Sequence, residues 1–117
     1  MGVARELRAR RTVNRREISV EAWADKDGIP FKMWCRPLTC YDLDQLQKKH
    51  PKFLETMSIA GMVDLILMKA EDESGDRIFN SAEDRLDLMG EETTVISGIA
   101  EQMFADVQSM EVAEKNS

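Results

Sequence analysis

The stretch from residue 53 to residue 70 constrains the fold most, because apolar side chains occupy almost every face of the helix that it predicts. Its apolar residues are Phe53, Leu54, Met57, Ile59, Ala60, Met62, Val63, Leu65, Ile66, Leu67 and Met68. A helix that is apolar on most faces lies at the centre of a domain or also contacts a partner. Gly61 costs such a helix about 1 kcal/mol relative to alanine, which indicates close packing or a weak point there. We therefore predict one central helix over 53–70, with Asp64 at an edge position.

Two further helices are predicted nearer the C-terminus. The first starts after Ser81, an N-cap with an acidic residue three positions later, and ends at Gly90. The second runs from about residue 92 to residue 113, because its apolar residues recur at helical spacing along one face. Those residues are Val95, Ile96, Ile99, Ala100, Met103, Phe104, Val107 and Met110. The polar residues 114–117 are expected to fray.

Two short strands are predicted ahead of the central helix. Apolar side chains occupy every second position in 18–23 and again in 31–36, the pattern of a strand buried on one face. Gly28, which tolerates a positive φ, lies in the turn between them. We expect a β-hairpin, and because an isolated hairpin is marginally stable, it must pack on the helices.

A helix over 40–49 is predicted from the residues that start and stop it. Thr39 is a suitable N-cap, and Asp42 three positions later is its reciprocal partner. Pro51 pushes the residue before it out of helical geometry, so the helix ends by His50. We expect this histidine to be solvated at the helix end.

The predicted fold class is α+β, mainly α, with a basic arm and a β-hairpin packed on a bundle of about four helices. A chain of 117 residues favours one domain with one modest core. Residues 1–16 are expected to form a flexible basic arm, 17–113 the single α-rich domain, and 114–117 a frayed tail.

Charge is distributed unevenly between the arm and the rest of the chain. Residues 1–16 hold six arginines and one glutamate, a net of +5, whereas the remainder holds ten basic and twenty-one acidic residues, a net of −11. The six arginines are Arg5, Arg8, Arg10, Arg11, Arg15 and Arg16. Such an arm docks on an acidic protein surface, either its own or that of a neighbouring copy, or it binds nucleic acid. Because no aromatics are interleaved with these arginines, a solvated or self-docking arm is the favoured interpretation.

The residues that carry chemistry form no catalytic or metal-binding pattern. Cys35 and Cys40 are the only cysteines, and their spacing matches no common zinc site. The acidic loop from Asp72 to Asp76 lacks the alternating oxygen ligands of a calcium loop. No phosphate-cradling glycine run is present. We therefore predict a protein that is not an enzyme and needs no metal or cofactor. No apolar run reaches membrane-spanning length, so we also expect no contact with a membrane.

Ordered features over most of the chain resemble those of a known family. They are Val20-Glu21-Ala22-Trp23 before a glycine turn, Arg36-Pro37-Leu38-Thr39, the apolar segment Met62-Val63-Asp64-Leu65-Ile66-Leu67, the loop Asp72-Glu73-Ser74-Gly75-Asp76-Arg77-Ile78-Phe79, Ser81-Ala82-Glu83-Asp84, the pair Leu86 and Leu88, and a terminal amphipathic helix. In this order they resemble the tail assembly chaperones of long-tailed, siphophage-like bacteriophages and prophages. The basic arm is not a hallmark of that family.

The resemblance implies a role in phage tail morphogenesis. Such chaperones bind the long helical tape-measure protein and promote polymerisation of tail-tube protein around it. They act in the cytoplasm of the bacterial host and are absent from the mature virion. A methionine-rich groove suits this role, because methionine adapts to varied apolar helices. The candidate protein-binding residues are Met57, Met62, Leu65, Met68, Met103 and Met110. The alternative for each is a place in the core, and a homo-oligomer is compatible with the role.

Two other functions stay open. One is a small nucleic-acid-associated regulator that uses the arginine arm. The other is a structural subunit of the tail tube, which needs more strand than one hairpin. The family also implies a programmed frameshift, and Glu114-Lys115-Asn116 permits the slippery sequence A AAA AAC at this point of the gene.

Overall fold

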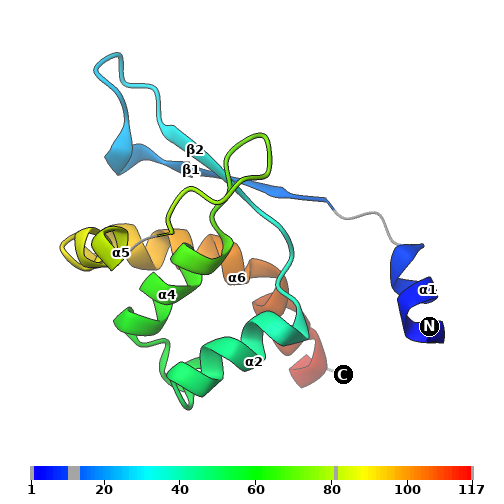
Figure 1. Ribbon diagram of the computed structural model, residues 1–117. Helices are drawn as coiled ribbons and strands as arrows, with labels where there is room; N and C mark the ends of the chain where they lie inside the picture. Colours follow the sequence, from blue (N-terminus) through cyan, green and yellow to red (C-terminus); the bar gives the residue numbers. More distant parts are fainter. Residues whose placement is uncertain (1, 11–13, 81, 117) are drawn as a thin grey trace.

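The computed structural model describes residues 2–10, 14–80 and 82–116, and the side chains as far as residue 105. The elements in chain order are α1 (Val3–Ala9), β1 (Arg16–Val20), the 3-10 turn η1 (Glu21–Trp23), β2 (Phe31–Cys35), α2 (Cys40–Lys49), α3 (Phe53–Thr56), α4 (Ile59–Lys69), α5 (Ala82–Met89) and α6 (Thr93–Asn116). Figure 1 shows the hairpin lying across one side of a group of helices. The predicted class, α+β and mainly α, is confirmed.

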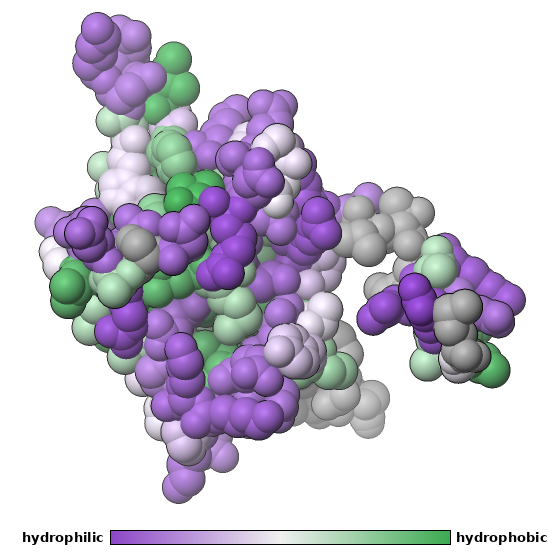
Figure 2. All heavy atoms as spheres, viewed as in Figure 1, coloured by the Kyte–Doolittle hydropathy of each residue, from purple (hydrophilic) through white to green (hydrophobic). Residues whose placement is uncertain are grey.

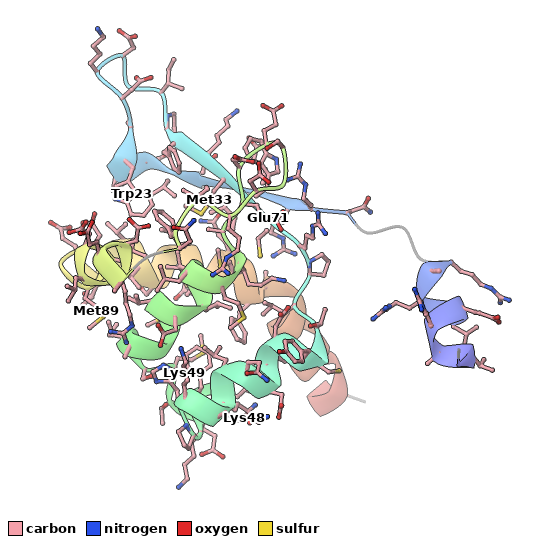
Figure 3. The ribbon with its side chains drawn as sticks, in the orientation of Figure 1. Trp23, Met33, Lys48, Lys49, Glu71 and Met89 are labelled. Carbon is pink, nitrogen blue, oxygen red and sulfur yellow. The ribbon has the colours of Figure 1, made fainter. Side chains whose placement is uncertain are left out.

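The predicted hairpin is confirmed, with a shorter first strand. β1 and β2 pair antiparallel, with Ile18 opposite Met33, and Gly28 in the connecting turn has a φ of 81°. The strand ends at Val20, so the prediction that it continues to Trp23 is wrong. The η1 turn instead brings the Trp23 indole N–H to the Glu91 carboxylate at 2.7 Å, a contact that the sequence pattern does not encode (Figure 3).

The loop after α4 adds one residue to the sheet. Glu71 exchanges two backbone hydrogen bonds of 2.8 Å with Trp34 of β2, on the side away from β1. Figure 3 shows Glu71 beside this strand. Strand structure among the described residues therefore consists of two five-residue strands and the bridges at Glu71.

The predicted central helix over 53–70 is wrong as one continuous element. It is divided into α3 and α4 by Met57, which has a left-handed φ of 48°, and by Ser58, whose side chain caps α4 by accepting from the Gly61 N–H. The break folds Phe53 back so that it packs against Gly61 and the Phe104 ring, whose centroid is 5.6 Å away. Apolar residues on every face of this stretch hide such a break, because no change of periodicity marks it.

The core lies between the sheet and the paired helices α4 and α6. The fully buried side chains include Ile18 and Met33 from the sheet, Val63, Leu65 and Ile66 from α4, and Ile96, Ile99 and Phe104 from α6. α4 contacts α2, α5 and α6, and α6 also contacts β1. Because α4 is covered on several sides, it holds the central position that its apolar composition predicts.

Both ends of the chain contain helices in the described residues. α1 is a helix that buries no residue and stands apart from the body in Figure 1. The body begins one residue earlier than predicted, because Arg16 is already the first residue of β1. α6 includes residues 114–116, where a frayed tail was expected. The predicted N-cap of α5, Ser81, lies outside the described residues, and α5 ends before Gly90 as predicted.

Candidate functional site

A groove of about 450 Å³ runs between α2, α4 and α5. Its lining residues are Tyr41, Asp42, Gln45, Leu46, Lys49, Asp64, Leu67, Met68, Arg77, Asn80, Ala82 and Arg85. Figure 2 shows this side of the molecule, where hydrophilic residues dominate and apolar ones reach the surface in small patches. The groove is therefore a local apolar opening in a polar surface.

The floor of the groove is apolar and its rim is polar. Leu46 is buried, while Leu67 and Met68 on α4 are half-buried and offer apolar surface. Tyr41 stands at the rim with 70% of its surface exposed. α2 starts at the predicted capping box, in which Thr39 and Asp42 exchange hydrogen bonds of 3.0 and 3.1 Å. This start of the helix positions the rim of the groove.

Asp64 is the centre of the charge network on one wall of the groove. His50 Nε2 lies 2.6 Å from Asp64 Oδ2, and Arg85 Nε donates to Oδ1 at 2.9 Å. Burial by itself would raise the pKa of Asp64, but the hydrogen bonds from Arg85 and His50 hold it below its ordinary value. The expectations of a solvated His50 and an edge position for Asp64 are wrong, because the fold brings both residues together with α5.

Asp42 is the second acid of the groove, and it is also held by a cation. Lys69 Nζ lies 2.8 Å from Asp42 Oδ2, and both side chains are nearly buried. Burial by itself would raise the pKa of Asp42, but the bonds from Lys69 and Thr39 lower it. Both acids of the lining are therefore neutralised by partners.

Lys49, Arg77 and Arg85 also line the groove. Because Arg85 is already paired with Asp64, and Lys69 with Asp42, the positive charge that favours an acidic ligand comes from Lys49 and Arg77. Arg77 donates to the backbone carbonyl of Leu67 at 2.8 Å, which keeps its guanidinium at the rim. A ligand with an apolar stripe and acidic flanks matches this combination of an apolar floor and a cationic rim.

The structure separates the candidate binding residues into core and surface. Met62, Leu65 and Met103 are no more than 5% exposed, so a surface role for these three is wrong. They face inward because α4 and α6 are covered by each other and by the sheet. Met57 and Met68 are partly exposed, and Met68 lines the groove. The Met110 side chain lies outside the described residues.

Four residues line the groove without having been predicted from the sequence: Tyr41, Leu67, Arg77 and Arg85. They come from α2, α4, the following loop and α5. No pattern within any one of these segments marks them, because only the packing of the helices places them around one opening.

Arg15 and Arg16 dock on the chain's own body. Arg15 donates to the backbone carbonyls of Asp72 at 2.9 Å and Glu73 at 2.6 Å, and its guanidinium lies 5.9 Å from the centroid of the Trp34 ring. Arg16 donates to the carbonyl of Gln102 at 2.6 Å. Arg5, Arg8 and Arg10 belong to α1 and its end, and Arg11 lies outside the described residues.

The cysteines and the acidic loop have structural surroundings. Cys35 is buried, and burial raises the pKa of its thiol to about 11, whereas Cys40 is exposed. Asp72 Oδ1 accepts from the backbone N–H groups of Ser74 and Asp76, so the carboxylate closes a turn. Over the described ranges, no three His, Cys, Asp or Glu side chains are grouped to hold a metal ion.

In the described part of the chain, no helix has both the length and the apolar character needed to cross a membrane.

No protein-family model matches the chain, and neither a curated protein nor a solved structure is significantly similar to it.

Proposed function

We propose that this protein is a non-enzymatic chaperone that binds an amphipathic helix of a partner in the groove between α2, α4 and α5. The observation that supports this function is the combination of an apolar floor at Leu67 and Met68 with the cationic rim of Lys49 and Arg77. An amphipathic helix lays its apolar face into a groove of this kind. Methionine in the floor accommodates side chains of different shape, which suits a partner with many similar helical segments.

The partner in this proposal is a phage tape-measure protein. Such a partner is long and helical, and its apolar face needs cover until tail-tube protein polymerises around it. Shielding the partner requires only that the chaperone bind it, without a chemical reaction. The apolar floor and the cationic rim of the groove supply such binding. The chaperone then acts in the cytoplasm of the bacterial host and is absent from the mature virion.

The test is binding to the tape-measure protein encoded in the same genome. Both proteins are co-expressed, and the complex is isolated through a tag on the tape-measure protein. Met68→Lys places a charge in the apolar floor and is expected to weaken binding at least tenfold. The matched control Ile29→Lys changes a residue of the hairpin turn that is 58% exposed, and binding is expected to persist.

The role of the cationic rim is tested by a separate measurement, the salt dependence of binding. Lys49→Glu reverses one rim charge and is expected to weaken binding more at low salt than at high salt, because added salt screens the attraction. Equal binding by wild type, Met68→Lys and Lys49→Glu would refute the groove as the site. Absence of binding by the wild type would refute the tape-measure partner.

A nucleic-acid-associated regulator is the alternative, and the exposed residues Arg8 and Arg10 favour it. The contacts of Arg15 and Arg16 with the body argue against it, since they leave fewer arginines for phosphates. Binding of nucleic acid through several phosphates weakens steeply with salt. Retention on heparin that persists well above low salt would support this alternative.

A further inference from the structure

The arm helix α1 is folded but exposed. It is seven residues long and buries none of them, whereas isolated helices shorter than about 12 residues are marginal in water. Val3 is 70% exposed and Leu7 is 50% exposed. Their spacing of four places them on one face of the helix, with Arg10, three positions after Leu7, on that face and Glu6, three positions after Val3, at its edge. A partner surface that covers this face would stabilise the helix.

The outer face of α5 has the complementary chemistry. Leu86 is 71% exposed and Met89 is 42% exposed, whereas Leu88 of the same helix faces the core. Glu83 and Asp87 are exposed one turn apart, and Glu83, three positions before Leu86, is its neighbour on the helix surface. This face therefore presents two large apolar side chains with acids along one side.

We propose that α1 of one copy docks on the outer face of α5 of a second copy. Val3 and Leu7 then cover Leu86, and Arg10 approaches the acids of α5. Charge favours the same contact, since α1 and its end carry Arg5, Arg8 and Arg10 against Glu6, whereas residues 17–117 carry a net −11. The groove between α2, α4 and α5 is not the site for this arm, because its rim is already cationic.

The position of α1 favours a contact between copies. α1 and α5 lie at opposite ends of the molecule, and Met89 marks the α5 end (Figures 1 and 3). Arg15 is anchored on the body at Asp72 and Glu73, and the chain from Ala9 to Arg15 spans about 20 Å at most. The longest dimension of the molecule is 49 Å. The contact joins two different surfaces, so it builds a ring or an open chain of copies.

Two complementary variants test the proposal by sedimentation velocity. Leu7→Asp disables the arm and Leu86→Lys disables the face, and each residue is exposed, so each variant is expected to fold. The wild type is expected to associate, and to do so less at high salt. Each variant alone is expected to be monomeric. Their equimolar mixture is expected to form a one-to-one dimer, because it retains one intact arm and one intact face per pair.

Specificity is tested by a control and by a cross-link. Ile29→Lys, on the hairpin, is expected to associate like the wild type. Leu7→Cys and Leu86→Cys, each in a Cys40→Ser background, are expected to give a disulfide-linked dimer when mixed and oxidised. Leu7→Cys mixed with Tyr41→Cys in the same background is expected to give none.

Several results would overturn the proposal. A wild type that is monomeric at low salt and high concentration would do so, as would association that survives Leu86→Lys. Loss of association in Leu86→Lys but not in Leu7→Asp would show that the arm is not the occupant. These outcomes are independent of tape-measure binding, which is measured separately with Met68→Lys.

Discussion

Gly61 and Phe53 are in such close contact that a Cβ on Gly61 would lie 2.3 Å from Cδ1 of the Phe53 ring. The ring is fully buried and packs against Phe104, so moving it away from residue 61 would disturb that packing. The glycine in α4 is therefore a requirement of packing, and the break after α3 is what brings the ring to it. This contact holds α3 and α4 together.

Gly61→Ala is predicted to destabilise the protein. Overpacking of a core costs about 1–3 kcal/mol, which outweighs the roughly 1 kcal/mol that alanine gains over glycine in a helix. Urea denaturation measures the difference as a lower midpoint. Gly98→Ala is the matched control, because no atom lies within 4 Å of a Cβ there. It is predicted to stabilise the protein by about 0.5–1 kcal/mol. A shift of both variants in the same direction would contradict the packing account.

Asp64→Asn is predicted to destabilise the protein at neutral pH by about 1–3 kcal/mol, because Arg85 and His50 lose a charged acceptor. The pKa of Asp64 is below its ordinary value of 3.8, so its stabilisation is present above that pH and is lost as the pH falls through the folded-state pKa. The difference in stability between Asp64→Asn and the wild type should therefore become smaller below about pH 4. Thermal unfolding across pH measures it.

Asp44→Asn is the control for that experiment. Asp44 pairs with Lys48 at 3.2 Å, and both side chains are more than 60% exposed. An exposed pair one turn apart contributes only about 0.3–0.5 kcal/mol. A loss of stability in Asp44→Asn as large as that in Asp64→Asn would show that the Asp64 network stabilises the protein no more than an exposed ion pair does.

Thr39→Ala is predicted to cost about 1 kcal/mol, because the side chain that accepts from the Asp42 N–H is removed. Thr39→Ser keeps the hydroxyl and should keep most of the stability. Chemical denaturation of both variants measures the difference. If serine and alanine destabilise equally, the cap is not the cause.

Arg15→Ala is predicted to loosen the loop from Asp72 to Asp76 while the core stays intact. The side chain makes two hydrogen bonds to that loop, and a loss of about 1–2 kcal/mol corresponds to local exchange that is about 5–30 times faster. Hydrogen exchange followed by mass spectrometry reads it out. Arg8→Ala on α1 is the control, and the same acceleration there would contradict the anchoring role.

The two cysteines are predicted to react at very different rates. The thiolate is the reactive form, and the Cys35 thiol is buried with a pKa of about 11, whereas Cys40 is exposed. Iodoacetamide at neutral pH should modify Cys40 first and Cys35 only when urea unfolds the chain. Intact mass and peptide mapping follow both sites. Equal labelling in the native state would contradict the burial of Cys35.

Local features of the fold follow from the sequence by itself. The capping box of Thr39 and Asp42, the turn at Gly28 and the end of α5 before Gly90 each depend on residues a few positions apart. The bounds of α2 agree with the prediction for this reason. The mainly helical class also follows, because helical spacing of apolar residues extends over most of the chain.

The tertiary structure decided everything that depends on residues far apart. Periodicity cannot reveal the break at Met57, because apolar residues occupy almost every face of the segment. The break allows Phe53 to pack against Phe104, a residue far away in the sequence. Nor can periodicity pair Asp64 with His50 and Arg85, or separate the buried Met62 from Met68 in the groove. The sequence determined which segments are helices and strands, since that choice is local. The packing of those segments against one another determined which side chains are buried and which remain on the surface to bind.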